Sequence, residues 1–323
     1  MNVFLDFEKP IADLEGKIEE LRQFGSNGTD GKHSGIDIDE EVARLEGKTA
    51  QMIADTYARL TPWQKTLVAR HPARPHFSDY AARLFTDFTP LAGDRLFGED
   101  RAIVAAVGRF RGRSVAVIGH EKGNDTKSRI KHNFGMAMPE GYRKVQRLFE
   151  MADRFGLPVI SLVDTAGAYP GVGAEERGQA EAIARSTQAC LAVGTPFVAT
   201  IIGEGGSGGA VAIATANKVF MLEHAIYSVI SPEGCASILW HKSDKASDAA
   251  AAMKITAQDL LELKVIDGII GEPVGGAHRG PEAAIQSTGD TIERALNELS
   301  QYGAEELRRR RRDKYLQIGK LDS

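Results

Sequence analysis

Cysteine is scarce in this chain of 323 residues, which has only Cys190 and Cys235. Both lie in apolar stretches, so a disulfide framework is not expected, and the reducing environment of the cytoplasm suits them. Two separate thiols also cannot supply a zinc site built from four thiolates. We therefore expect a cytoplasmic protein with no metal site of its own.

Long apolar runs and a surplus of one charge are also missing. No uncharged stretch reaches the roughly 18 apolar residues that a membrane-spanning helix needs. Residues 1–10 carry several charges, so a signal peptide is not expected. The net charge is only −4, and the basic run at residues 308–312 follows Glu305 and Glu306, as on a solvated helix end. Neither a membrane nor a nucleic acid is an expected partner.

The hydrophobic pattern divides the chain into three regions. Apolar residues recur at steps of three and four over residues 11–24 and 39–60, with a glycine-rich loop expected at 25–35. From residue 101 a hairpin pattern begins, and strands then alternate with helices, which indicates an α/β fold with a largely parallel sheet. We expect a helical subunit-contact region at residues 1–75, a core at 76–280 and a C-terminal helix at 281–323.

Two glycine-rich segments each follow an expected strand. Residues 203–209 read GEGGSGG after the apolar run 196–202, and residues 164–173 read DTAGAYPGVG after the run 158–163. Turns of this kind lie side by side at the carboxyl ends of parallel strands, where ligands bind. Glycine lets bare backbone amides approach a ligand, and a helix start adds unpaired N–H groups. These two turns are the predicted ligand site.

The second segment favours an oxyanion hole over a phosphate loop. The phosphate-loop pattern fails because Gly209 stands where lysine is required and Ala210 where a hydroxyl is required. Backbone amides of Gly208 and Gly209 at a helix start could instead stabilise developing negative charge. This interpretation needs neither of the missing side chains.

A dinucleotide site is the alternative interpretation of the same segment. The pattern G-x-G-x-x-G matches at Gly203, Gly205 and Gly208, and Glu223 follows about 20 residues after the first glycine. Glu204, however, would put a carboxylate among glycines meant to hold a pyrophosphate. A nicotinamide-dependent oxidoreductase therefore stays the weaker hypothesis.

Longer motifs give the chain a family resemblance. It resembles the α subunit of bacterial acetyl-coenzyme A carboxylase carboxyltransferase in DTAGAYPGVGAEERGQ at residues 164–179, GEGGSGG at 203–209 and YSVISPEGCASILW at 227–240. The segments FLDFE at 4–8, ARHP at 69–72 and HNFGM at 132–136 are also similar. The resemblance covers nearly the whole chain. One departure is Ala166, where the family commonly has proline.

The resemblance implies a crotonase-like superhelix of ββα units, with a helical extension before it and a C-terminal helix after it. It also implies transfer of a carboxyl group from carboxybiotin to acetyl-CoA, giving malonyl-CoA for fatty acid biosynthesis. Gly208 and Gly209 match the pair whose amides hold the ureido oxygen of biotin. Biotin-binding roles are expected for Gly167, Ala168, Tyr169, Pro170, Gly171, Gly205 and Gly206.

The family's partners are implied in the same way. The α subunit works in an α2β2 assembly with the active site between the two kinds of subunit, and the β subunit carries the zinc-binding cysteines. Biotin arrives on a carrier protein after an ATP-dependent biotin carboxylase has carboxylated it. No cofactor is expected to be bound covalently to this chain, and it should be active only with the β subunit.

Other charged residues leave a second alternative and one unassigned stretch. Glu204, Glu223 and Glu233 are candidate general acids for a hydratase or isomerase of the same fold. The basic stretch at residues 122–131 is expected to be a solvated face, with contact to CoA phosphates or the carrier the less favoured interpretation.

Overall fold

A computed structural model describes residues 3–27 and 38–320. Its sheet has the strand order β1-β2-β3-β4-β5-β6-β8, with β7 paired to β5. β1, β2 and β3 pair antiparallel, whereas the strands from β3 onward pair in parallel. The α/β fold and the hairpin are thus confirmed. The strands are β1 (Phe85–Pro90), β2 (Ile103–Phe110), β3 (Arg113–His120), β4 (Val159–Thr165), β5 (Phe197–Gly206), β6 (Lys218–Leu222), β7 (Ile226–Ser228) and β8 (Gly268–Ile270).

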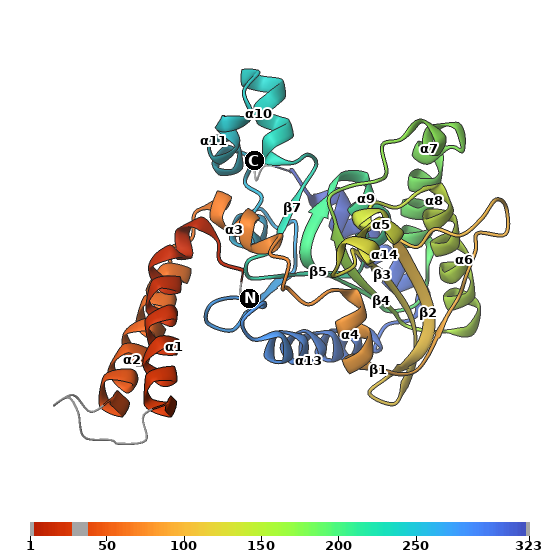
Figure 1. Ribbon diagram of the computed structural model, residues 1–323. Coiled ribbons are helices and arrows are strands. Elements are labelled where there is room, and N and C mark those ends of the chain that lie inside the picture. Colours follow the sequence, from red (N-terminus) through yellow and green to blue (C-terminus); the bar gives the residue numbers. More distant parts are fainter. Residues whose placement is uncertain (1–2, 28–37, 321–323) are drawn as a thin grey trace.

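Helices flank the sheet and extend from it (Figure 1). Local signals set several ends: Thr61 caps the first of the short helices by accepting from the Gln64 amide, and Gly156, at φ +65°, ends a long one. The helices are α1 (Lys9–Asn27), α2 (Ile38–Tyr57), α3 (Pro62–Ala69), α4 (Phe77–Leu84), α5 (Thr126–Lys131), α6 (Pro139–Phe155), α7 (Val172–Glu176), α8 (Gln179–Ala192), α9 (Ser207–Ala214), α10 (Pro232–Trp240), α11 (Ala246–Met253), α12 (Ala257–Glu262), α13 (Pro281–Leu299) and α14 (Ala304–Gln317).

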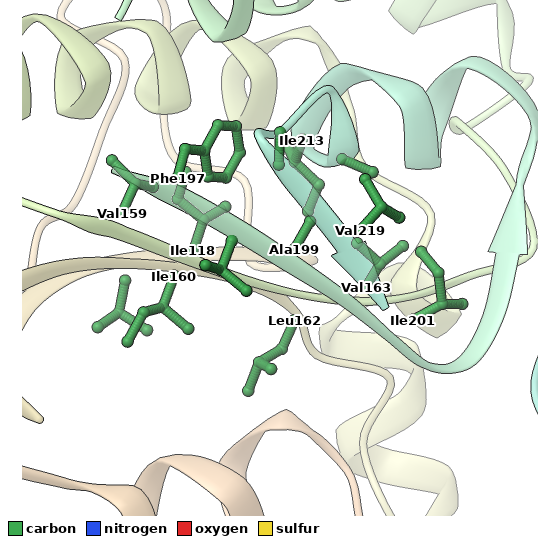
Figure 2. Close-up of a cluster of buried hydrophobic side chains, with 14 of the residues drawn as sticks. Ile118, Val159, Ile160, Leu162, Val163, Phe197, Ala199, Ile201, Ile213 and Val219 are labelled. Atoms are coloured by element: carbon green, nitrogen blue, oxygen red, sulfur yellow. The ribbon is translucent and has the colours of Figure 1, made fainter. Parts of the chain in front are cut away.

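The main core lies around β4 and β5. Every residue of both strands is buried, as expected for parallel strands that are covered on both faces. Figure 2 shows aliphatic side chains of these strands, such as Ile160 and Ile201, gathered with Phe197. This packing fixes the carboxyl ends of β4 and β5, from which both predicted turns emerge.

The N-terminal helices α1 and α2 pack on each other and project from the body of the molecule (Figure 1). Leu14, Ile18 and Leu45 form a small core of their own between the two helices. α1 continues to Asn27, so residues 25–27 are helical and not part of the expected loop, and residues 28–37 lie outside the described residues. No helix among the described residues is long and apolar enough to cross a membrane.

The C-terminal segment forms two helices rather than the single one expected. α13 ends at Leu299, and α14 begins at Ala304 after Gly303. The interpretation of residues 308–312 as a solvated face is wrong for Arg311, which is fully buried. Its guanidinium donates to the carbonyl oxygens of Cys190 and Val193, at 2.7 and 2.6 Å.

The sequence also predicts one helix over residues 175–193, but the structure divides it. α7 ends at Glu176 and α8 begins at Gln179, because Gly178 takes a left-handed conformation, φ +79°, between them.

The 3-10 turns are η1 (Asp6–Glu8), η2 (Asn133–Gly135) and η3 (Ser243–Lys245).

Candidate functional site

Strand β5 continues into the glycine-rich segment. Its last residues pair with β7, Glu204 opposite Ile226 and Gly206 opposite Ser228. The expectation of a loop over the whole of residues 203–209 is therefore wrong for the first four of them. The segment can continue as a strand because its glycines leave room for neighbouring parts of the protein, such as β7.

Gly203 and Gly205 are packing positions. A Cβ atom on Gly203 would lie 2.6 Å from Asp164 Oδ1, and one on Gly205 would lie 2.7 Å from the Tyr227 ring. Both glycines are buried within the strand, so they cannot form the loop that a pyrophosphate requires. The dinucleotide interpretation is accordingly wrong.

The turn itself is short and strained. Ser207, the first residue of α9, has φ +51°, a conformation that costs a non-glycine residue about 1–3 kcal/mol. Gly208 and Gly209 follow as the second and third residues of the helix. Amides at these positions have no partner within a helix. The other hydrogen bonds found in the described residues do not use them either. Gly208 is partly exposed, whereas Gly209 is buried.

The two predicted turns touch each other. A Cβ atom on Gly209 would lie 2.8 Å from Ala168 N and 2.8 Å from Gly167 C, and one on Gly206 would lie 2.2 Å from Ala166 C. The sequence prediction that the segments after β4 and β5 meet is confirmed. Gly206, expected to contact biotin, is buried and instead allows the two backbones to approach.

The first turn uses one of its own amides. The Gly167 amide donates to Thr165 Oγ1 at 3.1 Å, and that hydroxyl donates to Gly167 O at 2.8 Å. Gly167 has φ +150°, which favours glycine. Its amide is therefore committed inside the turn. Ala166 stands at the exposed point of the turn.

Tyr169 is tied to the body of the protein by its backbone. Its amide donates to Ala137 O at 2.9 Å, and its carbonyl accepts from Gln179 Nε2 at 2.9 Å. The ring lies over Gly171, where a Cβ atom would be 2.3 Å from Tyr169 Cε1. Pro170 is exposed beside the partly exposed ring. Residues 169–171 thus form a fixed wall next to the turn.

Behind the turns lies a cluster of charged side chains that the sequence analysis did not predict as a group. Lys122 Nζ lies 2.7 Å from Asp164 Oδ1 and 3.3 Å from Glu204 Oε2. Arg70 Nη2 lies 2.7 Å from Glu204 Oε1, and its Nη1 lies 2.6 Å from Glu233 Oε1. The paired residues are 42 to 163 positions apart along the chain, so no periodic signal could have linked them.

The charge of each group follows from its neighbours. Burial alone would raise the pKa of Asp164, but attraction to Lys122 and hydrogen bonds hold it well below the usual range. Burial opposes the charge of Lys122, yet Asp164 and Glu204 raise its pKa. Lys122 is therefore not on a solvated face, unlike the exposed Lys127 and Lys131 of the same basic stretch.

The candidate general acids are already engaged. Arg70 holds Glu204 and Glu233, and Glu223 Oε2 accepts from the Glu272 amide at 3.2 Å. Burial would raise the pKa of Glu233, but the hydrogen bond from Arg70 lowers it. A general acid for hydration needs a raised pKa and a free proton, so this pairing argues against the hydratase alternative.

One further cluster has the composition of a metal site. Ligand atoms of Glu8, His71 and His278 lie within 4.8 Å of one another. However, His71 contacts Val3 O and the Ala73 amide through its two nitrogens, and Glu8 accepts from the Leu5 amide. The two imidazoles are stacked, 4.0 Å between centroids, so their lone pairs do not converge. The cluster attaches the N-terminal segment to the core.

Ser207 carries a signal that the sequence analysis did not use. Gly205-x-Ser207-x-Gly209 matches the G-x-S-x-G pattern of a nucleophile elbow, and its positive φ fits such a turn. A serine nucleophile needs a general base within hydrogen-bond reach. Within the part of the chain that the structure describes, no hydrogen bond joins Ser207 to a histidine. The turn therefore offers amides rather than an activated hydroxyl.

Comparison with solved structures defines the class of fold. The chain matches transcarboxylase 12S, solved with methylmalonyl-coenzyme A, with a TM-score of 0.58 at 19% identity over 71% of this chain and 42% of the other. It matches the geranyl-CoA carboxylase β subunit of P. aeruginosa with a TM-score of 0.56 at 16% identity, covering 76% of this chain and 45% of that one. The fold is the crotonase-like fold of carboxyltransferases.

Sequence comparison then gives the family. Residues 4–319 match the family model described as acetyl co-enzyme A carboxylase carboxyltransferase-like. The α subunits of acetyl-coenzyme A carboxylase carboxyl transferase from Azorhizobium caulinodans and Methylobacterium nodulans are 64% and 66% identical over 320 residues, 99% of each chain. The chain belongs to this family of α subunits, which confirms the fold class and the carboxyltransferase function expected from the sequence.

Proposed function

We propose that the amides of Gly208 and Gly209 hold the ureido oxygen of carboxybiotin while its carboxyl group passes to acetyl-CoA. The observation that supports this most directly is the pair of unpartnered amides at the start of α9, at a turn that lies against the first glycine turn. Gly208 and Ala168 are partly exposed at this junction, where no large side chain among the described residues stands between them. A flat ureido ring can approach such a surface closely.

The chemistry suits backbone amides. When the carboxyl group leaves the biotin nitrogen, the bonding electrons move toward the ureido oxygen, and fixed N–H dipoles stabilise that charge more than they stabilise the bound substrate. Such a donor contributes about 2.7–4 kcal/mol. The same biotin nitrogen then takes a methyl proton from acetyl-CoA, and the resulting enolate attacks the released carbon dioxide to form malonyl-CoA. No side-chain base from this chain is needed.

Residues of the first turn would shape the biotin site. Ala168, Tyr169, Pro170 and Gly171 form its wall, with the tyrosine ring held in place through its own backbone. Gly206 lets the two turns come together, Gly205 makes room for the Tyr227 ring, and the Gly167 amide is committed inside its own turn, so none of the three would hold the ligand directly. The thioester of acetyl-CoA would be held by a partner.

That partner is the β subunit of an α2β2 assembly. The matched parts of the two solved structures are only 42% and 45% of their chains, so more than half of each of those chains lies outside the match. Beyond β7, which pairs with the end of β5, Val229 and the residues Ile238, Leu239 and Trp240 of α10 are exposed. An apolar surface of this kind suits a subunit contact. Zinc would belong to the β subunit.

Biotin would arrive on its carrier protein after a biotin carboxylase has carboxylated it with ATP. These components need not touch this chain at the same time. The projecting pair α1 and α2, with its separate small core, is suited to contacts between subunits.

An exchange assay tests the proposal. The chain alone should not decarboxylate malonyl-CoA in the presence of free biotin, because half of the site is absent. Co-expression with a zinc-bearing β subunit should give activity. Full activity of the chain without any partner, or none with it, would contradict the proposed shared site.

A further inference from the structure

The charged cluster behind the two turns connects the elements that form the site. Asp164 is in β4, three residues before Gly167, and Glu204 is in β5, four residues before Gly208. The Glu204 amide donates to Asp164 Oδ1 at 2.9 Å. A Cβ atom on Gly203 would lie only 2.6 Å from the same oxygen, so the Asp164 carboxylate fills the space between the two strands. Its position sets how the strands meet.

Lys122 is the cation that both carboxylates share. It follows the end of β3 by two residues, and its side chain is only 17% exposed. Its ammonium lies 2.7 Å from Asp164 Oδ1 and 3.3 Å from Glu204 Oε2. Gly135 makes room for it, because a Cβ atom there would lie 2.8 Å from Lys122 Cγ. The lysine therefore reaches the site through a gap kept open by a glycine.

The cluster has a fixed charge balance. Lys122 and Arg70 oppose Asp164, Glu204 and Glu233, which leaves a net charge of −1. Without Lys122 the net charge would be −2, and two carboxylates would stand close together in a largely buried place. Like charges in such a place repel strongly and cost several kcal/mol when unpaired.

We infer that Lys122 is a positioning residue for carboxyl transfer: by pairing with both Asp164 and Glu204 it holds the two turns together and keeps uncompensated negative charge away from the amides of Gly208 and Gly209. This inference rests on the function proposed above, since it concerns the negative charge that forms during transfer. Lys122 acts through the two carboxylates and does not touch the substrate.

Charge-compensated variants of Lys122 test the inference in the complex with the β subunit. Lys122→Met should lower kcat for malonyl-CoA decarboxylation about tenfold or more, with KM for malonyl-CoA changed by less than about twofold. The double variant Lys122→Met/Glu204→Gln has the wild-type net charge of −1, so it should recover most of the lost kcat. Lys122→Arg keeps the charge and should retain most of the activity.

The control is Lys218→Met, which removes a lysine from an ion pair with Glu298 at 3.0 Å on the other side of β5. It should leave kcat unchanged. Wild-type activity with the β subunit establishes the proposed function independently of any variant. The inference fails if Lys122→Met raises KM with kcat unchanged, or if the double variant is no better than the single one.

A folding defect in Lys122→Met would not leave the question open. Glu204→Gln keeps the Lys122–Asp164 and Arg70–Glu233 pairs and leaves no carboxylate of the cluster unpaired, so it should fold and provide a reference kcat. Lys122 still pairs with Asp164 in Glu204→Gln, so the inference requires the double variant to have a lower kcat than Glu204→Gln, with KM for malonyl-CoA within about twofold. An unchanged kcat, or a raised KM, would show that Lys122 does not act through the two carboxylates and would overturn the inference.

Discussion

The backbone of the first glycine turn leaves no room for a side chain at Gly209, which lies in the second turn. The atoms that a Cβ would meet there, Gly167 C and Ala168 N, belong to the main chain and cannot rotate aside. At Gly208 the nearest obstacle is Ile183 Cγ2 at 3.3 Å, the end of a side chain that can move slightly. The two neighbouring glycines therefore differ in what they tolerate.

We expect Gly209→Ala to lower carboxyl transfer about a hundredfold, since displacing the turn removes the alignment of an amide donor. Gly208→Ala keeps its amide and should stay within about threefold of the wild type, while its alanine stabilises the helix by about 0.5–1 kcal/mol. The malonyl-CoA exchange assay and thermal unfolding of both variants provide the measurement. Equal losses in the two variants would contradict this distinction.

Sequence reasoning identified these glycines but could not assign their separate tasks. A run of glycines predicts close approach without saying whether a ligand or the protein itself comes close. The structure shows two groups. Gly203, Gly205 and Gly206 make room for other parts of the protein, whereas Gly208 and Gly209 lie in the first turn of α9. The role of Lys122 could not be predicted because its partners are distant from it in the sequence. They come together only because β3, β4 and β5 are neighbours in the sheet.

At the scale of elements, α14 depends on one buried arginine. Arg311 donates to the carbonyls of Cys190, Val193 and Thr195 at the end of α8 and just beyond it. No carboxylate pairs with it among the described residues, so its charge is satisfied by these oxygens and by Asn217. The arginine thus attaches the last helix to the end of α8.

Arg311→Met should therefore lower the free energy of unfolding by about 3–5 kcal/mol, since several buried carbonyls lose their donor at once. Arg309 offers a matched control: it is exposed and pairs with Glu306 and Asp313 on the same helix. Arg309→Met should change the stability by less than about 0.5 kcal/mol. Urea denaturation measures both, and a loss below about 1 kcal/mol for Arg311→Met would contradict the attachment.

Periodicity predicted the elements better than it predicted where they break. The hairpin of β2 and β3 and the buried strands β4 and β5 follow from β-branched residues and apolar runs. Gly178, by contrast, interrupts a helical pattern that continues on both sides, so only its left-handed backbone reveals the boundary. The burial of Arg311 could not be predicted for a similar reason. The sequence does not distinguish it from the other arginines at 308–312, and only the packing of α14 shows which of them is buried.

At the scale of the whole molecule, buried histidines make the folded state sensitive to acid. Burial lowers the pKa of His120 to about 3, with Asp164 opposing the shift. Burial also lowers the pKa of His278 to about 3, with the neighbouring cations and His71 acting in the same direction. Burial would raise the pKa of Glu272, but Arg74 lowers it to about 2.

The sign of the effect follows from proton binding. Below the ordinary histidine pKa of about 6.5 the unfolded chain binds protons that the folded chain does not, so this stability is complete above pH 6.5 and declines as the pH falls toward 3. Each histidine contributes a slope of up to about 1.4 kcal/mol per pH unit. Glu272 contributes only below its ordinary pKa of about 4.5, down to about 2.

Between pH 6.5 and 4.5 the buried histidines therefore stabilise the fold less as the pH falls, while Asp100, whose pKa burial raises to about 6, acts in the opposite direction. His120→Gln should reduce the slope of unfolding free energy against pH in this interval by up to about 1.4 kcal/mol per pH unit, since one neutral buried imidazole is gone. The exposed His241 provides the control, and His241→Asn should leave the slope as it is. Urea unfolding at pH 7, 6 and 5 gives the three slopes. If His120→Gln kept the full wild-type slope, His120 would have to carry a proton in the folded protein, with its charge facing Asp164 and Lys122 in the cluster behind the turns.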